Sequence, residues 1–262
     1  MLNTELTSKT SIPHCYGIPE TKIKSHSPYG LPIVDNCVNC KLKNSNFFCS
    51  LAPEAMSAFN RIKHVSSYPE GAMVFLEGQP ARGVYLLCQG RVKLMTANSE
   101  GKTLILKIGE PGEVLGLQSV VSGRPHQLTM ETLQPCQLAF IAREDLLAFL
   151  KQYGEACLHA AQHLSRDCQA AYGLIRSIGL SHSVSERLAR LALQLAGDTA
   201  GNDKELRVKM ALTHEEIAQL ISASRETVTR TLSDFKKQKM MEFKGATLII
   251  HDRNALAALI QE

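Results

Sequence analysis

Residues 212–239 read LTHEEIAQLISASRETVTRTLSDFKKQK, a stretch that predicts two short helices joined by a tight turn. Thr213 followed by Glu216 is a capping-box pattern, in which the hydroxyl and the carboxylate satisfy backbone donors at a helix start. After a turn at Ser222, Ser224 can cap a second helix. Apolar residues on that helix recur at spacings of four and three, which fixes its buried side. They are Val228, Leu232 and Phe235.

The opposite side of the second helix carries side chains suited to reading DNA bases. Arginine can pair with the O6 and N7 edge of guanine through two hydrogen bonds, and glutamate can accept from the amino group of cytosine. Cationic residues one or two turns later would meet phosphate. The alternative is an amphipathic hairpin with a solvated face, but the ordered run Ser-Arg-Glu-Thr-Val-Thr-Arg favours base reading. The candidate DNA-binding residues are Ser224, Arg225, Glu226, Thr229, Arg230, Lys236 and Lys237.

This run resembles the C-terminal domain of the Crp/Fnr transcription regulators, the family of the cyclic AMP receptor protein and its oxygen-sensing relatives. Their recognition helices carry a similar Arg-Glu pair, then a small residue and an arginine. Ser222 stands where the family usually has glycine, and a non-glycine residue with positive φ costs about 1–2 kcal/mol. The resemblance implies a homodimer that reads a palindromic site with half-sites like TGTGA or TTGAT, and RNA polymerase as a second partner.

Length and composition set the broad class. A chain of 262 residues predicts two domains, and 44% apolar with 21% charged residues is typical of a soluble protein. No apolar run approaches the roughly 18 residues that span a bilayer, and the N-terminus lacks an export signal, so we expect a cytoplasmic location and no membrane partner. The net charge of +4 is too small to indicate nucleic-acid binding by itself. Eight cysteines without an export signal indicate metal, redox or buried thiols rather than disulfides.

Residues 1–50 predict an extended N-terminal arm that contains cysteines. Cys37, Cys40 and Cys49 have the spacing C-x2-C-x8-C. Two cysteines separated by two residues can hold one metal centre from a single turn, and a third thiolate can close in on it. Zinc would need a further Cys or His, whereas a four-iron cluster needs four thiolates. Candidates in the arm are His14, Cys15 and His26.

Residues 51–150 predict an antiparallel β-roll that acts as a sensor domain, because short β-rich runs alternate with glycines. The clearest strands are 84–87, 92–95 and 104–108, with turns expected at Gly78, Gly90, Gly101 and Gly109. The segments EGQPARGVYLLCQGRVKL and PGEVLGLQSVVSG resemble the cyclic-nucleotide-binding roll of the same family.

The resemblance also indicates where a ligand pocket would lie. Family members that bind cyclic nucleotides use a glutamate for the ribose and an Arg-Ser or Arg-Thr pair for the phosphate. By this resemblance, Gly116 stands at the position of the glutamate, and His126 and Gln127 stand at the positions of the Arg-Ser or Arg-Thr pair. A phosphodiester without its arginine loses a bidentate, charge-assisted partner. Cyclic AMP is therefore not the expected ligand.

Cys136 lies where oxygen-sensing family members carry their fourth cluster ligand. The resemblance thus implies a metal set of Cys37, Cys40, Cys49 and Cys136, holding one [4Fe-4S] cluster per subunit. The alternatives are a zinc or thiol-switch arm and an arm without a metal, since free cysteine is also among the most buried residue types. A cluster would make oxygen, nitric oxide or another oxidant the signal, and its loss would change the packing of the arm against the dimer helix.

Residues 151–180 predict a dimerisation helix, because small and apolar residues alternate at spacings of four and three as in a coiled-coil seam. Residues 181–262 predict a winged helix-turn-helix domain, with Ser183 and Glu186 as a second capping box and a hairpin around Lys244 and Gly245 as the wing. The fold class is therefore α+β, with a β-roll, a long helix and a winged helix-turn-helix. The seam residues are Cys157, Ala161, Leu164, Cys168, Ala171, Ile175 and Ile178.

The leading interpretation is a homodimeric, sequence-specific transcription regulator with a redox or gas signal. Two alternatives are the same regulator controlled by a small molecule or thiol oxidation, and a metal or redox protein with no DNA role. An enzyme is not expected, because the chain has no glycine-rich phosphate loop, no G-x-S-x-G and no H-E-x-x-H.

Overall fold

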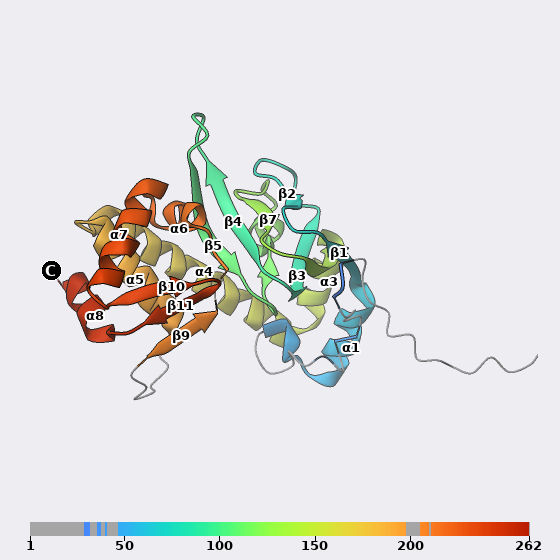
Figure 1. Cartoon of the computed structure of the whole chain (residues 1–262). Helices are drawn as coiled ribbons and strands as arrows, with labels where there is room; N and C mark the ends of the chain where they lie inside the picture. The colour runs from blue at the N-terminus through green and yellow to red at the C-terminus, as the bar shows by residue number, and fades with distance from the viewer. Residues whose placement is uncertain are drawn as a thin grey trace, which may run out of the picture.

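The computed structural model describes residues 29–31, 36–37, 40, 47–197, 205–209 and 211–261. Within them the chain forms a β-roll, a long helix and a smaller C-terminal domain, in that order (Figure 1). The predicted α+β fold is thereby confirmed. The arm candidates His14, Cys15 and His26 lie outside the described residues. None of the helices in the described part is long and apolar enough to cross a membrane.

The β-roll consists of two antiparallel four-stranded sheets. One has the order β1-β8-β3-β6 and the other the order β2-β7-β4-β5. The strands predicted at 84–87, 92–95 and 104–108 lie within β3, β4 and β5 and are confirmed. The bounds are β1 (Lys63–Tyr68), β2 (Met73–Phe75), β3 (Gly83–Gln89), β4 (Val92–Ala97), β5 (Thr103–Gly109), β6 (Val114–Leu115), β7 (Thr129–Thr132) and β8 (Cys136–Ala142).

One of the four predicted turn glycines is not in a turn. Gly109 is the last residue of β5 and pairs with Val92, and a Cβ at Gly109 would lie 2.8 Å from the Val92 Cγ2 atom. Close packing inside the roll therefore explains this glycine, and the turn follows at Gly112, where φ is 94°. The other three have positive φ as expected, namely Gly78, Gly90 and Gly101.

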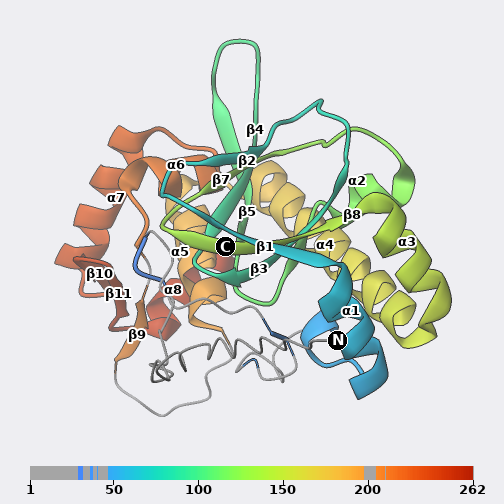
Figure 2. The ribbon, with the colours of Figure 1, turned by 90° about the vertical axis from the view of Figure 1, so that its right-hand side faces the viewer.

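The first sheet separates two hydrophobic clusters, because successive side chains of a strand point to opposite faces. In β3, Leu87 belongs to the cluster inside the roll, whereas Leu86 and Cys88 belong to the cluster on the outer face. The outer cluster is covered by helices that gather on one side of the roll (Figure 2). These are η1 (Phe47–Cys49), α1 (Pro53–Ile62), α2 (Leu117–Ser122), α3 (Arg143–Gln152) and the start of α4 (Gly154–Leu180).

The long helix α4 is fixed to the roll by polar contacts on one side. The Nε2 atom of the buried His163 lies 2.8 Å from the carbonyl oxygen of Val114. The Lys107 ammonium contacts a carboxylate oxygen of Asp167 at 2.8 Å and one of Glu113 at 3.0 Å. These contacts orient α4, so that its other side is left facing away from the roll.

The C-terminal domain packs helices on a three-stranded sheet with the order β10-β11-β9. The wing is confirmed: β10 (Met241–Lys244) and β11 (Thr247–Ile250) are antiparallel, with Gly245 at positive φ. Strand β9 (Leu206–Lys209), beyond the connector that begins at Gly197, was not predicted from the sequence. The helices are α5 (Val184–Ala196), α6 (His214–Ile221), α7 (Arg225–Lys237) and α8 (Arg253–Gln261).

Candidate nucleic-acid interface and sensor sites

The helix-turn-helix forms through the local signals of its sequence. The Thr213 hydroxyl accepts a hydrogen bond from the Glu216 amide at 3.2 Å, and the Glu216 carboxylate accepts one from the Thr213 amide at 2.8 Å. This capping box starts α6. Ser222 ends α6 in the left-handed conformation, with φ 51° and ψ 54°. The turn that usually carries glycine is therefore made here by serine, at the conformational cost expected from the sequence.

Helix α7 buries one side in the C-terminal core. The Ser224 hydroxyl caps the helix by accepting from the Thr227 amide at 3.2 Å. Val228, Leu232 and Phe235 are buried and pack with residues of α5, α6 and the wing. Because these three fix the rotation of the helix about its axis, the opposite side is turned to solvent.

All seven predicted DNA-binding residues are exposed. Most of them line one shallow, open concavity along α7, together with Ser233 and Asp234. Such a surface offers the guanidinium groups of Arg225 and Arg230 in one direction, which suits contact with base edges and phosphates. The lining residues from the predicted set are Arg225, Glu226, Thr229, Arg230 and Lys237.

Several of these side chains already have partners within the domain. The Thr229 hydroxyl lies 2.9 Å from Nδ1 of His214 and donates to the Arg225 carbonyl at 2.9 Å. The Lys236 ammonium lies 3.1 Å from a carboxylate oxygen of Glu242 in the wing. Hydrogen bonds from Lys244 and Lys236 lower the pKa of the Glu242 carboxyl to about 2. Lys236 therefore pairs with the wing in the structure, and a phosphate would compete with Glu242 for its ammonium group.

Most of the predicted dimer seam lies on the side of α4 that faces away from the roll, but Leu164 packs against the outer hydrophobic cluster. Cys157, Ala161, Cys168, Ala171 and Ile175 are exposed, whereas Leu164 and Ile178 are half-buried. Large apolar side chains stay uncovered along this helix: Ile175 is 65% exposed and Leu180 is 72% exposed. These exposed side chains form an apolar surface on α4 that a partner could cover.

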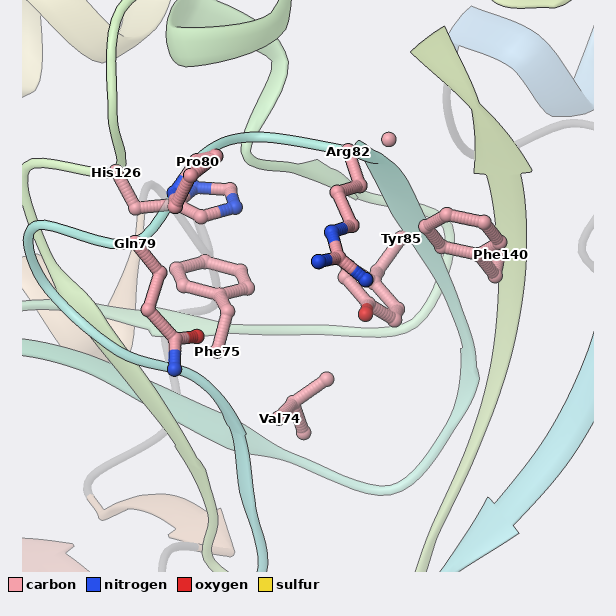
Figure 3. Close-up of a pocket in the computed structure, with 9 residues that line it drawn as sticks. Val74, Phe75, Gln79, Pro80, Arg82, Tyr85, His126 and Phe140 are labelled. Carbon is pink, nitrogen blue, oxygen red and sulfur yellow. The ribbon is translucent and has the colours of Figure 1, made fainter.

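A cavity of about 320 Å³ opens in the roll where a ligand pocket was expected. Figure 3 shows the side chains around it, among them Phe75, Arg82, Tyr85 and His126. The His126 ring stacks on Phe75 with centroids 3.9 Å apart, and burial lowers the pKa of His126. Gly116 lies directly beside His126, since a Cβ there would come within 3.1 Å of the His126 Cε1 atom. The pocket therefore presents a neutral imidazole, with the Arg82 guanidinium as its cationic group.

Of the four predicted metal ligands, the structure places the three arm cysteines outside the roll and the fourth inside it. Cys37 and Cys49 lie in the outer hydrophobic cluster, and the Cys40 amide donates to the Cys37 carbonyl at 3.3 Å. Burial raises the pKa of the Cys49 thiol to about 12, and the neighbouring Cys37 and Cys40 thiols contribute to the increase. Cys136 instead lies in the cluster inside the roll. In the part of the chain that the structure describes, no three His, Cys, Asp or Glu side chains are already grouped to hold a metal ion.

The sequence interpretation missed Cys88 and Lys63. Cys88 lies in the same outer cluster as Cys37 and Cys49. Lys63 is buried at the start of β1. The only sequence signal for Cys88 is its place in the run GVYLLCQG, at an even spacing from Val84 and Leu86, which puts all three on one face of a strand.

These sites and this fold define a class of protein: a β-roll sensor joined by a long helix to a winged helix-turn-helix. A family model for the cyclic nucleotide-binding domain matches residues 65–153, and a model for the Crp-like helix-turn-helix domain matches residues 186–259. The chain belongs to the Crp/Fnr family, and it is a DNA-binding transcription regulator. Regulators of this family bind DNA and usually act as dimers.

The relatives are transcription regulators rather than enzymes. The chain is 29% identical over 219 residues to the CRP-like cAMP-activated global transcriptional regulator of Mycobacterium tuberculosis, covering 82% of this chain and 96% of the relative. It is 27% identical over 225 residues to the cyclic AMP receptor protein of Thermus thermophilus, covering 84% and 97%. Among solved structures, a CooA mutant from Carboxydothermus hydrogenoformans is similar in fold, with a TM-score of 0.69 and 20% identity over 83% of this chain and 96% of that one.

Proposed function

We propose that the protein is a homodimeric regulator that reads a palindromic DNA site with half-sites like TGTGA or TTGAT, and that it contacts RNA polymerase as a second partner. The observation that carries this proposal is the exposed arginine side of α7, whose opposite side is locked in the core by Val228, Leu232 and Phe235. Two such helices related by a twofold axis would reach major grooves one helical turn apart, about 10 base pairs from centre to centre.

We further propose that a [4Fe-4S] cluster, one per subunit, is held by cysteines of the N-terminal arm and controls DNA binding in response to oxygen, nitric oxide or another oxidant. The contacts of the arm support this coupling. Phe48 and Cys49 of η1 lie in one hydrophobic cluster with Ala156 and Ala160 of α4. The Ala52 amide also donates to the Glu155 carboxylate at 3.2 Å. A change at the cysteines would therefore act directly on the start of the dimer helix.

Purification without oxygen tests this control. We expect a brown protein containing iron and sulfide, whose affinity for a cognate palindrome in an electrophoretic mobility assay collapses after exposure to air. The Cys37→Ser variant should be colourless and should not respond to air. A colourless, iron-free wild-type protein prepared without oxygen, with DNA binding equal to that of Cys37→Ser, would contradict cluster control.

A small molecule in the roll is the second candidate signal, and the cavity beside Arg82 favours it. The names of the relatives from M. tuberculosis and T. thermophilus refer to cyclic AMP. In this chain, the imidazole at the expected phosphate position is buried against Phe75, and burial lowers its pKa, so that it carries no charge near neutral pH. An anionic effector would instead have to pair with Arg82, and a cyclic nucleotide is not the ligand that we propose.

Without the arginine, we expect cyclic AMP to bind with a dissociation constant well above about 1 mM, which means a binding free energy weaker than about −4 kcal/mol. Cyclic AMP added at about 1 mM is therefore expected to change neither the melting temperature nor the DNA affinity. Differential scanning fluorimetry and fluorescence anisotropy with a labelled palindrome would measure both. The His126→Arg variant is the matched comparison, since it restores a cation at the phosphate position. A wild-type melting temperature that rises and saturates at micromolar cyclic AMP would contradict the prediction.

A further inference from the structure

A single carboxylate in the wing pairs with two lysine side chains that come from different elements. One oxygen of Glu242, on β10, lies 3.1 Å from the Lys236 Nζ atom, and the other lies 3.0 Å from the Lys244 Nζ atom. The side chains of Lys236 and Lys244 are 66% and 65% exposed, whereas that of Glu242 is 10% exposed. The two ammonium groups therefore lie close together at the surface, and the carboxylate that joins them is shielded from solvent.

The two lysines continue the DNA-reading surface of α7. Lys236 follows Thr229 by seven residues, which is about two helical turns, so that both lie on the same side of the helix. Thr229 lines the concavity formed by the candidate DNA-binding residues. Lys244 is the last residue of β10, next to the wing turn at Gly245. A helix that reads base edges brings the surface beside it to the DNA backbone, so that Lys236 and Lys244 are placed to meet phosphates.

Pairing with Glu242 reduces the positive charge that the two lysines offer to DNA. Each cation that neutralises a phosphate releases counterions, and this release gives the sequence-independent part of DNA affinity and its dependence on salt. Ion pairs of exposed side chains contribute little to stability, so that a phosphate can replace Glu242 as the partner of either lysine. The carboxylate and a phosphate therefore compete for the same ammonium groups.

His251 offers Glu242 a partner that remains when a lysine turns to DNA. The His251 Nε2 atom lies 3.5 Å from a Glu242 carboxylate oxygen, and its Nδ1 atom lies 3.0 Å from an oxygen of Glu205. A ring protonated at both nitrogens can donate to both carboxylates, whereas a neutral ring has a single N–H. Glu205 also pairs with Arg207 at 2.7 Å and does not depend on His251. Since a shielded carboxylate without a partner is unfavourable, His251 makes the release of the lysines easier.

We propose that Lys236 and Lys244 form a second phosphate-binding site for DNA, and that Glu242 and His251 set its strength. Glu242 is a positioning residue, which holds both ammonium groups in the free protein and competes with phosphates for them. His251 stabilises Glu242 once a phosphate has taken a lysine. The ligand is the sugar–phosphate backbone of any duplex, so that the site acts alike on cognate and scrambled DNA. A protein that prefers a different palindrome would contradict the proposed half-sites and leave this inference in place.

Glu242→Gln in the full-length protein tests the competition, with binding to a scrambled duplex measured by fluorescence anisotropy at several salt concentrations. The variant is expected to bind about 3-fold to 10-fold more tightly at about 0.1 M salt, and the slope of log affinity against log salt should steepen by up to about one unit per subunit. Lys244→Ala should weaken binding and make the slope shallower. A Glu242→Gln protein that binds no more tightly than the wild type, or a Lys244→Ala protein with an unchanged slope, would overturn the proposal.

Glu54→Gln is the matched control for the change in charge. It removes the same charge from an exposed position in α1, which lies at the far end of the roll from α7 (Figure 1 and Figure 2). It should leave both the affinity and the slope unchanged. An equal increase of affinity in Glu54→Gln would show that the net charge of the chain sets the affinity, and would overturn the proposal. Loss of the fold cannot produce tighter binding, so that Glu242→Gln stays informative at any melting temperature.

A double-mutant cycle tests the role of His251. His251→Phe removes both ring nitrogens and should weaken binding to the scrambled duplex by about 2-fold to 10-fold, because Glu242 then has only the lysines as partners. In the Glu242→Gln background the same substitution should have no effect, since no carboxylate is left to neutralise. Equal effects of His251→Phe in the two backgrounds would overturn the role of His251.

Discussion

Arg225→Ala is expected to weaken binding to a cognate palindrome by about 30-fold to 20,000-fold, because one bidentate arginine–guanine pair contributes about 1–3 kcal/mol and a dimer makes two. Arg225 is exposed in the first turn of α7, where the helix-turn-helix geometry puts side chains against base edges. The variant should bind scrambled DNA nearly as well as the wild type. Fluorescence anisotropy on cognate and scrambled duplexes, at several salt concentrations, would measure both affinities.

Lys236→Ala is the matched control on the same helix. It removes a positive charge from the C-terminal part of α7, where we expect contact with phosphate rather than with base edges, so that it should weaken binding to all DNA sequences alike. The slope of log affinity against log salt should fall by about one unit for each lysine–phosphate pair that the substitution removes. Equal losses of affinity on cognate and scrambled DNA for Arg225→Ala would contradict base reading by that residue.

Ile175→Glu is expected to yield a monomer and to lower the affinity for the palindrome by about 100-fold to 10,000-fold, the factor that linking two binding modules typically contributes. Ile175 is 65% exposed on α4 and is the most exposed large apolar residue of the predicted seam. A carboxylate there would be buried against its symmetry mate, and a buried unpaired charge is strongly unfavourable. Sedimentation equilibrium would give the oligomeric state.

Gln169→Glu provides the comparison for that variant. It adds the same charge at an exposed position of α4, about a third of a turn away from the seam. It should leave both the dimer and the DNA affinity unchanged. A dimeric Ile175→Glu protein, or a wild type that is monomeric under every redox condition, would show that these residues do not form a dimer interface.

The C-terminal domain also contacts the roll directly. A change in the roll could therefore reach the C-terminal domain through these contacts as well as through α4. The Lys93 ammonium of β4 lies 3.7 Å from the carboxylate of Glu216, the residue that completes the capping box of α6. The Arg91 guanidinium donates to the Lys209 carbonyl of β9 at 3.3 Å. Figure 1 shows α6 beside β5. A shift of the roll would therefore change the contacts of α6, the first helix of the helix-turn-helix.

Much of the fold could be predicted because its signals are local. The capping box at Thr213, the cap at Ser224 and the spacing of Val228, Leu232 and Phe235 each depend on residues within about two helical turns of one another. The wing follows in the same way from two short apolar runs around Gly245. Elements without such a pattern were missed, among them α1, α2, β1 and the short edge strand β9.

The sequence by itself determined the architecture, the family resemblance and the exposed arginine side of α7, since periodicity and capping act between near neighbours in the chain. Only the tertiary structure decided which cysteines meet. Cys88 and Cys136 are 48 positions apart in the sequence and both are buried. The register of β3 against β8 pairs Leu86 with Ala139 on the outer face and Leu87 with Leu138 inside the roll. Cys88 lies in the outer cluster with the first pair, and Cys136 lies in the inner cluster with the second. Strand pairing between distant segments sets that register, and spacing along the chain carries no record of it.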